Sequence, residues 1–150
     1  MYRYNVTVTR IVDGDTVDVD IDLGFGMVYK KQRVRMMGID TPESRTKDLE
    51  EKFYGKQAKY HLTDLLKDKQ VELVSHDKGK FGRILGELFI TQVENEGHPQ
   101  WETKIEKSVN QLMIEHFHAV PYLGQSKEDT QLGHSYNKAA LNEQGIIYTP

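Results

Sequence analysis

The sequence has no cysteine among its 150 residues, so neither a disulfide bond nor a metal site with thiolate ligands is possible. It also lacks long hydrophobic runs, and no stretch is apolar enough to span a bilayer. The first ten residues alternate between apolar and polar side chains and do not resemble a secretory signal. We therefore expect a cytoplasmic or otherwise intracellular protein without a membrane partner, or a mature form whose leader has been removed; a viral or phage origin stays open.

An excess of positive charge is also absent. The 20 basic and 23 acidic side chains give a formal net charge of −3, whereas proteins that grip nucleic acid through its backbone are usually basic. Any affinity for nucleic acid must therefore come from a local cluster of Lys and Arg. This charge balance argues against a dedicated high-affinity DNA-binding protein, but not against an enzyme that needs only transient contact.

Alternation of apolar and polar residues predicts that the first half of the chain is rich in strands. Gly24 and Gly26 mark a turn between two of these strands, so the pair is predicted to form a hairpin. Pro42 follows the second strand of the hairpin and ends it, because proline donates no backbone hydrogen bond. The predicted strands cover residues 6–12, 17–23, 27–37, 71–74 and 84–90.

Helical spacing of apolar residues follows later in the chain. Ala58, Leu62 and Leu66 fall on one face of a predicted helix. Ser108 is placed to cap a second helix, and Gly145 to close a terminal one. The polar stretch that directly follows the last predicted strand is predicted to be a loop, because glycine and proline interrupt it. The predicted helices cover residues 55–67, 108–116 and 126–144, and the predicted loop covers 91–101.

These elements predict an α+β fold built on a five-stranded β-barrel of the OB-fold type, with about three helices. A chain of this length is large enough to bury roughly two-thirds of its unfolded surface as one domain, and it contains no internal repeat. We expect a single domain over residues 1–150. The barrel and its inserted helices would occupy about 1–124, and a C-terminal helical segment about 126–145.

Three aspartates two residues apart, Asp18, Asp20 and Asp22, first suggest a calcium loop of the EF-hand type. Such a loop needs Gly at its sixth position and Glu at its twelfth. Counted from Asp18, those positions hold Leu23 and Tyr29. The three aspartates are therefore interpreted as the solvent face of a strand.

Four other charged residues are out of place in or beside the apolar strands. Asp15 shares the inward parity of the apolar residues that follow it, and Arg35 lies inside an apolar strand. Asp40 and Glu43 flank a Thr-Pro turn. Charges in apolar strand context are costly unless a metal ion or an anion compensates them. The combination indicates a hard cation acting on a phosphate, while turn or capping roles for Asp15 and Asp40 stay open.

The histidines do not form a recognisable metal or catalytic pattern. His116 and His118 are two residues apart, and residues at that spacing do not share a helical face. We interpret all six as surface or partly buried residues, namely His61, His76, His98, His116, His118 and His134.

Three sequence blocks in register resemble the signature of the staphylococcal nuclease (thermonuclease) family. They are DGDTV at 13–17, VRMMGIDTPE at 34–43 and KFGRIL at 80–85. Val109-Asn110 and Val120-Pro-Tyr122 are similar to later landmarks of that family. The resemblance spans about residues 6–144, nearly the whole chain.

The resemblance implies a role for each matching residue. Asp15 and Asp40 would bind Ca²⁺, together with the backbone carbonyl of Thr41. Glu43 would position or deprotonate the attacking water, and Arg35 and Arg83 would clasp the scissile phosphate. Lys80, Phe81 and Tyr122 match positions that line the nucleotide pocket in the family.

The implied reaction is endonucleolytic hydrolysis of DNA or RNA at the bond to the 5′-oxygen, leaving 3′-phosphate ends. Oxygen ligands suit calcium, although magnesium or manganese would bind to the same atoms. Two arginine forks would supply planar donors for the phosphate oxygens. The sequence leaves the choice between DNA and RNA open.

Departures from the family pattern concern substrate affinity. Phe81 stands where family members often have Tyr, and Gly124 stands where a second pocket Tyr is expected. The loss of an aromatic ring reduces base stacking. The chain is also mildly acidic, whereas secreted members tend to be basic. We therefore expect weaker substrate binding with intact chemistry.

Two rival interpretations remain beside the enzyme. The first is a non-catalytic module on the same barrel that binds nucleic acid or protein. Retention of all five acidic and basic site side chains favours the enzyme over this module. The second is a subunit of a larger assembly, with 91–101 and the terminal helix as contact surfaces; a monomer is the default expectation.

Overall fold

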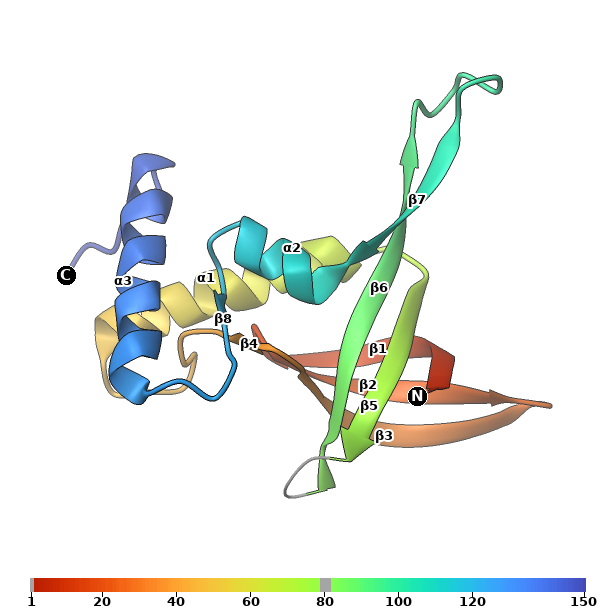
Figure 1. Cartoon of the computed structure of the whole chain (residues 1–150), viewed down its shortest axis with the longest axis horizontal. Helices are drawn as coiled ribbons and strands as arrows, with labels where there is room; N and C mark the ends of the chain where they lie inside the picture. Colours follow the sequence, from red (N-terminus) through yellow and green to blue (C-terminus); the bar gives the residue numbers. More distant parts are fainter. Residues whose placement is uncertain (1, 79–81) are drawn as a thin grey trace.

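Five strands close into a ring in the computed structural model, which describes residues 2–78 and 82–150. The strands are β1 (Tyr2–Asp13), β2 (Thr16–Gly24), β3 (Met27–Met36), β5 (Val71–Lys78) and β6 (Ile84–Glu94). Neighbours follow the order β3-β2-β1-β5-β6, and a parallel pairing of β3 with β6 completes the ring. The predicted α+β fold on a five-stranded barrel is confirmed (Figure 1).

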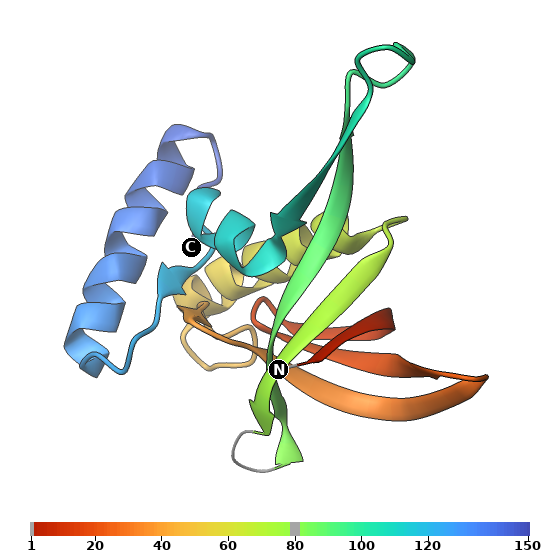
Figure 2. The same ribbon diagram turned by 45° about the vertical axis from the view of Figure 1, so that its right-hand side comes forward.

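Among the described residues, three helices, two very short strands and one longer strand beside β6 accompany the ring. The helices are α1 (Leu49–Leu66), α2 (Val109–Glu115) and α3 (Lys127–Glu143). The short strands β4 (Ile39–Asp40) and β8 (Val120–Pro121) pair with each other antiparallel. In both views α3 stands beside the β4–β8 pair, on the side of the molecule away from the β6 ribbon (Figures 1 and 2). Across the part of the chain described, no helix combines the length and the apolar character needed to cross a membrane.

The hydrophobic core fills the barrel and the space between the barrel and the first two helices. Val17, Val34 and Leu73 from the strands are fully buried, as are Ala58 and Leu62 from α1. These α1 residues are the ones whose spacing predicts the helix. The alternating residues of the strands and the helical face of α1 therefore meet in one core, as their periodicities require.

The start of α1 differs from the prediction. The helix begins at Leu49 and not at 55, because Asp48 caps it: the Asp48 carboxylate accepts hydrogen bonds from the backbone N–H groups of Glu50 and Glu51. The first turn is largely exposed and has no apolar periodicity, so its helical state depends on the cap.

The predicted loop at 91–101 is wrong in part. Strand β6 continues to Glu94, and β7 (Thr103–Ser108) returns antiparallel to it. The two strands form a ribbon that projects out of the barrel (Figure 2). Both faces of the outer ribbon are largely exposed, so burial imposes no hydrophobic alternation on the sequence there.

Asn110 links α2 to the barrel beside the β3–β4 turn. Its side-chain amide donates to the carbonyl of Met37 at 2.9 Å, and its oxygen accepts from the backbone N–H of Leu88 at 3.1 Å. The side chain is buried, so these bonds satisfy groups that would otherwise lose water without compensation. The segment that leads into β4 is thereby fixed from the α2 side.

Three histidines gather between α1 and the end of α2. His61 Nε2 lies 2.7 Å from His116 Nδ1, and the rings of His61 and His118 stack at 4.5 Å between centroids. His118 is buried, with 6% of its surface exposed. The prediction of surface or partly buried histidines is therefore wrong for His118, because the turn after α2 folds back onto α1 and covers this ring.

We predict that this histidine cluster makes stability fall in mild acid. Burial first, and then the charges of His61 and His116, lowers the pKa of His118 from 6.5 to about 4. Between about pH 4 and pH 6.5, the unfolded chain therefore binds a proton at His118, whereas the folded chain leaves this imidazole unprotonated. The contribution to stability is complete above pH 6.5 and is lost as the pH falls toward 4, about 2 kcal/mol by pH 5.

Urea unfolding at about pH 7.5 and about pH 5 measures this effect. His118→Gln should reduce the loss of unfolding free energy between the two pH values, whereas His76→Gln, at an exposed position, should not. Equal losses in wild type and His118→Gln would show that other groups, such as the carboxylates, cause the acid sensitivity.

Gly55 permits close contact between α1 and the loop that carries Glu43. A Cβ atom at position 55 would lie 2.3 Å from the backbone oxygen of Glu43. An exposed Gly→Ala change in a helix normally gains roughly 1 kcal/mol. Here the clash is expected to reverse the sign, so Gly55→Ala should destabilise the fold by about 1–3 kcal/mol. Chemical denaturation measures this, with Lys56→Ala on the exposed face of the same helix as the control; a stabilised Gly55→Ala variant would contradict the prediction.

Candidate functional site

Asp15 lies in the turn between β1 and β2 and is buried, with 8% of its surface exposed. Its Oδ1 accepts from the hydroxyl of Thr16 at 2.9 Å, and its Oδ2 accepts from the backbone N–H of Thr41 at 3.1 Å. The predicted inward orientation of Asp15 is confirmed. The turn position and these two bonds also show that the carboxylate is held by the barrel itself.

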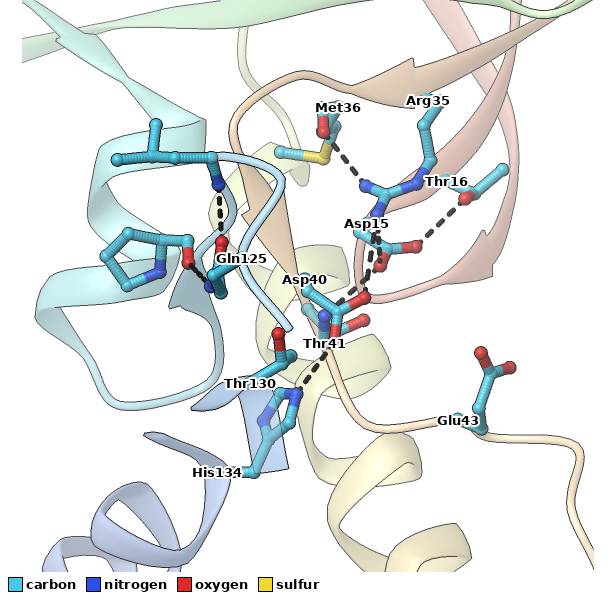
Figure 3. Close-up of polar contacts among 12 residues, drawn as sticks. Asp15, Thr16, Arg35, Met36, Asp40, Thr41, Glu43, Gln125, Thr130 and His134 are labelled. Carbon is cyan, nitrogen blue, oxygen red and sulfur yellow. Dashed lines mark hydrogen bonds and ion pairs between the residues drawn. The ribbon is translucent and has the colours of Figure 1, made fainter. Parts of the chain in front are cut away.

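Arg35 extends from β3 toward both site aspartates (Figure 3). Its Nη2 lies 3.4 Å from Asp15 Oδ2 and 3.7 Å from Asp40 Oδ1, and its Nη1 donates to the carbonyl of Met36 at 2.9 Å. The side chain is 19% exposed. Arg35 therefore meets anions inside the fold and does not turn out into solvent.

Asp40 ends β4 and has a second partner, from the C-terminal helix. His134 on α3 places its Nε2 2.8 Å from Asp40 Oδ2. His134 is buried, so the prediction that it is a surface or partly buried residue is wrong. The cause is the packing of α3 against the β4–β8 pair, which covers the polar face of the helix.

Glu43 lies apart from this cluster, on the loop that follows β4, as Figure 3 shows. Its side chain is exposed. Partial burial, followed by the negative charges of Asp13, Asp15 and Asp40, raises the pKa of Glu43 above its ordinary value. A carboxylate with a raised pKa is a better proton acceptor at neutral pH than an unperturbed one.

A cavity of about 860 Å³ brings most of the predicted site residues together. The parallel pairing of Val34 with Ile84 and of Arg35 with Leu85 places the start of β6 beside Arg35. Arg83, which directly precedes β6, thus lines the same cavity. The predicted residues in the lining are Arg35, Asp40, Thr41, Glu43, Arg83 and Tyr122.

Three further observations concern the predicted nucleotide pocket. Tyr122 lines the cavity and is 45% exposed, so its ring is available for stacking. Gly124 also lines the cavity, where it contributes no ring. Lys80 and Phe81 lie outside the described residues.

The C-terminal helix supplies site residues that sequence reasoning missed. Lys127, Thr130 and Gln131 line the cavity beside the barrel residues, and His134 contacts Asp40 one turn further along. The available signal was the polar pair Thr130 and His134, four residues apart on one helical face. Both are buried, whereas the apolar Leu132 of the same helix is 54% exposed.

The donor set at this site fits a hard cation. Within residues 2–78 and 82–150, no three His, Cys, Asp or Glu side chains group as a metal site. Two carboxylates face a single guanidinium, which leaves excess negative charge. Thr41 Oγ1 is buried there and has no hydrogen-bond partner among the described residues. Oxygen donors with excess negative charge suit a cation that completes its shell with water or substrate oxygens.

Comparison with known proteins finds a matching family model and several relatives. A family model described as staphylococcal nuclease homologue matches residues 33–146. A thermonuclease of Staphylococcus hyicus is 35% identical over 100 residues, which cover 60% of this chain and 54% of the relative. A micrococcal nuclease of Shigella flexneri is 27% identical over 137 residues, covering 91% and 69% respectively. The endonuclease YncB of Bacillus subtilis is 26% identical over 149 residues, covering 95% and 64%. The chain thus spans 54% to 69% of the length of these relatives.

Proposed function

Because this chain belongs to the staphylococcal nuclease family, we propose that it is a calcium-dependent nuclease that hydrolyses phosphodiester bonds of DNA or RNA. The observation that carries the proposal is the contact of Arg35 with Asp15 and Asp40, beside a cavity that Arg35, Asp40, Glu43 and Arg83 line. A cavity lined by carboxylates and by two guanidinium groups suits a phosphate together with a cation.

Asp15, Asp40 and the backbone carbonyl of Thr41 would hold the metal ion. When bound, the ion supplies Lewis acidity that neutralises charge on a phosphate oxygen and favours ionisation of water. Asp15 is held by two hydrogen bonds from the barrel, so its carboxylate keeps its orientation without the ion. Such preorganisation lowers the cost of assembling the site.

Arg35 and Arg83 would bind the scissile phosphate. The distances from Arg35 Nη2 to the two carboxylates, 3.4 and 3.7 Å, exceed the roughly 2.7–2.9 Å of a strong charge-assisted hydrogen bond. Arg35 is therefore only loosely held by the acids, and its planar fork can pair with phosphate oxygens. Charge that accumulates on those oxygens during attack by water is stabilised most by such fixed donors.

Glu43 would accept the proton of the attacking water. Its exposed position at the cavity supports this role. Water adds to phosphorus as one of its protons passes to Glu43, and the bond from phosphorus to the 5′-oxygen breaks. The 5′-oxygen takes up a proton from solvent and leaves as a hydroxyl, and Glu43 returns its proton to solvent. The phosphate remains on the 3′ side.

We predict that single-stranded DNA is cut when calcium is present and is left intact in EDTA. Glu43→Gln should lower the rate by orders of magnitude, because glutamine has no basic oxygen to take the proton. Cleavage of a labelled oligonucleotide measures both effects. Glu51→Gln is the matched control, since Glu51 lines the same cavity but has no assigned chemical role. A Glu43→Gln variant with the wild-type rate would contradict the assignment of the base.

Arg35→Lys is expected to lower kcat by orders of magnitude with little change in the far-UV circular dichroism spectrum. Lysine keeps the positive charge but replaces the planar fork with a single point donor. Arg33→Lys, on the same strand but paired with Asp18 at the surface, should keep near-wild-type activity. An equally inactive Arg33→Lys variant would show that loss of a guanidinium anywhere on this strand, and not loss of the fork of Arg35 at the site, is responsible.

A folded protein that binds oligonucleotides but cuts none would favour the non-catalytic binding module instead. Fluorescence anisotropy with a labelled oligonucleotide distinguishes this outcome from a protein that neither binds nor cuts.

A further inference from the structure

We propose that His134 of α3 is a positioning residue that orients the carboxylate of Asp40 for metal binding, so that the C-terminal helix is part of the metal site. This inference rests on the proposed function. It adds a residue that lies outside the three sequence blocks, and it assigns to α3 a role beyond covering the barrel.

The chemistry of His134 and Asp40 fixes the direction of the hydrogen bond between them. An ionised carboxylate only accepts hydrogen bonds, so the ring nitrogen at 2.8 Å, His134 Nε2, donates to Asp40 Oδ2. The imidazole is enclosed, with 4% of its side chain exposed. Its Nδ1 is buried and has no hydrogen-bond partner in the described part of the chain. The enclosed ring therefore directs its donor at Asp40 and makes no competing bond there.

The two site aspartates are held by different parts of the fold. Asp15 accepts from Thr16 and Thr41, both of which belong to the barrel or its adjoining loop. Asp40 sits at the end of a strand of two residues, and His134 reaches its Oδ2 from α3. The other oxygen of Asp40, Oδ1, faces Arg35 at 3.7 Å. His134 thus fixes the plane of a carboxylate whose backbone belongs to a short element.

The packing of α3 brings His134 within reach of Asp40. A Cβ atom at Gly133 would lie 2.9 Å from Val120 Cγ1, so glycine allows the helix to approach β8. Val120 in turn pairs with Asp40 across the two short strands. One turn later along α3, the side-chain amide of Asn137 donates to the carbonyl of Ala119 at 3.0 Å. The helix is therefore held at β8 and at the residue that precedes it.

Groups that orient a metal ligand from behind typically change metal affinity about 10–100-fold when removed. Without His134, the Asp40 side chain would gain rotational freedom that metal binding must remove again, and its Oδ2 would lose a donor. Calcium affinity should therefore fall even though His134 itself does not touch the ion.

Calcium chloride titrated into the protein by isothermal titration calorimetry tests the proposal. His134→Leu is expected to raise the Kd for calcium about 10–100-fold, whereas His134→Gln, whose side-chain amide can place an N–H near the position of Nε2, should restore most of the affinity. Asn137→Ala is the matched control. It removes the hydrogen bond from α3 to the carbonyl of Ala119 and leaves Asp40 unchanged. It should lower the thermal midpoint of unfolding and leave calcium affinity unchanged.

Two results would overturn the inference but leave the proposed function intact. One is wild-type calcium affinity in His134→Leu. The other is an Asn137→Ala variant that loses as much affinity as His134→Leu, since docking of α3, and not the bond to Asp40, would then be responsible. Absence of calcium binding by the wild type would overturn both the inference and the proposed function. Calcium binding that depends on His134, without cleavage of any oligonucleotide, would support the inference and contradict the nuclease.

Discussion

The guanidinium of Arg35, held between the carboxylates of Asp15 and Asp40, is the interaction on which the site depends. Each of the three charges is partly or fully withdrawn from water, so the opposite charges compensate one another there. They come from the β1–β2 turn, from β3 and from β4, so the charge cluster requires these three elements to meet. Pairing of β3 with β6 closes the barrel and brings Arg83 to the cavity that Arg35 and Asp40 line.

Close backbone contacts allow the helices to complete this arrangement. Gly55 lets α1 touch the loop of Glu43, and Gly133 lets α3 touch β8. A side chain at either position would push a helix away from the segment that carries a site residue. The consequence is greatest for α3, because its displacement would also withdraw His134 from Asp40. Packing and site geometry are therefore coupled through two residues that have no chemical function of their own.

Much of the barrel follows from local patterns, because alternation along β1, β2 and β3 and helical spacing along α1 report which face is buried. The patterns fail where a segment does not bury one of its faces. The outer β6–β7 ribbon is exposed on both faces and shows no such alternation, so the end of β6 was predicted as loop and β7 was not predicted. The start of α1 depends on the Asp48 cap. Of the site, Asp15, Arg35 and Asp40 are conspicuous in sequence because a charge contradicts an apolar pattern. His134 is not, because a histidine on a polar helical face resembles any surface residue.

The order of residues along the chain sets the strands, the helices and the identity of the charged groups, since each of these depends on neighbours a few positions away. It also carries the three blocks that place the chain in its family. Tertiary structure decides which of those groups meet. The bond from His134 to Asp40 spans 94 positions, and the contact exists only because α3 docks on a pair of two-residue strands. The stacking of His118 on His61 likewise joins α1 to the segment after α2, and the lowered pKa of His118 arises from its burial there. Desolvation and contact between distant segments have no local signal, and so they become visible only in the folded molecule.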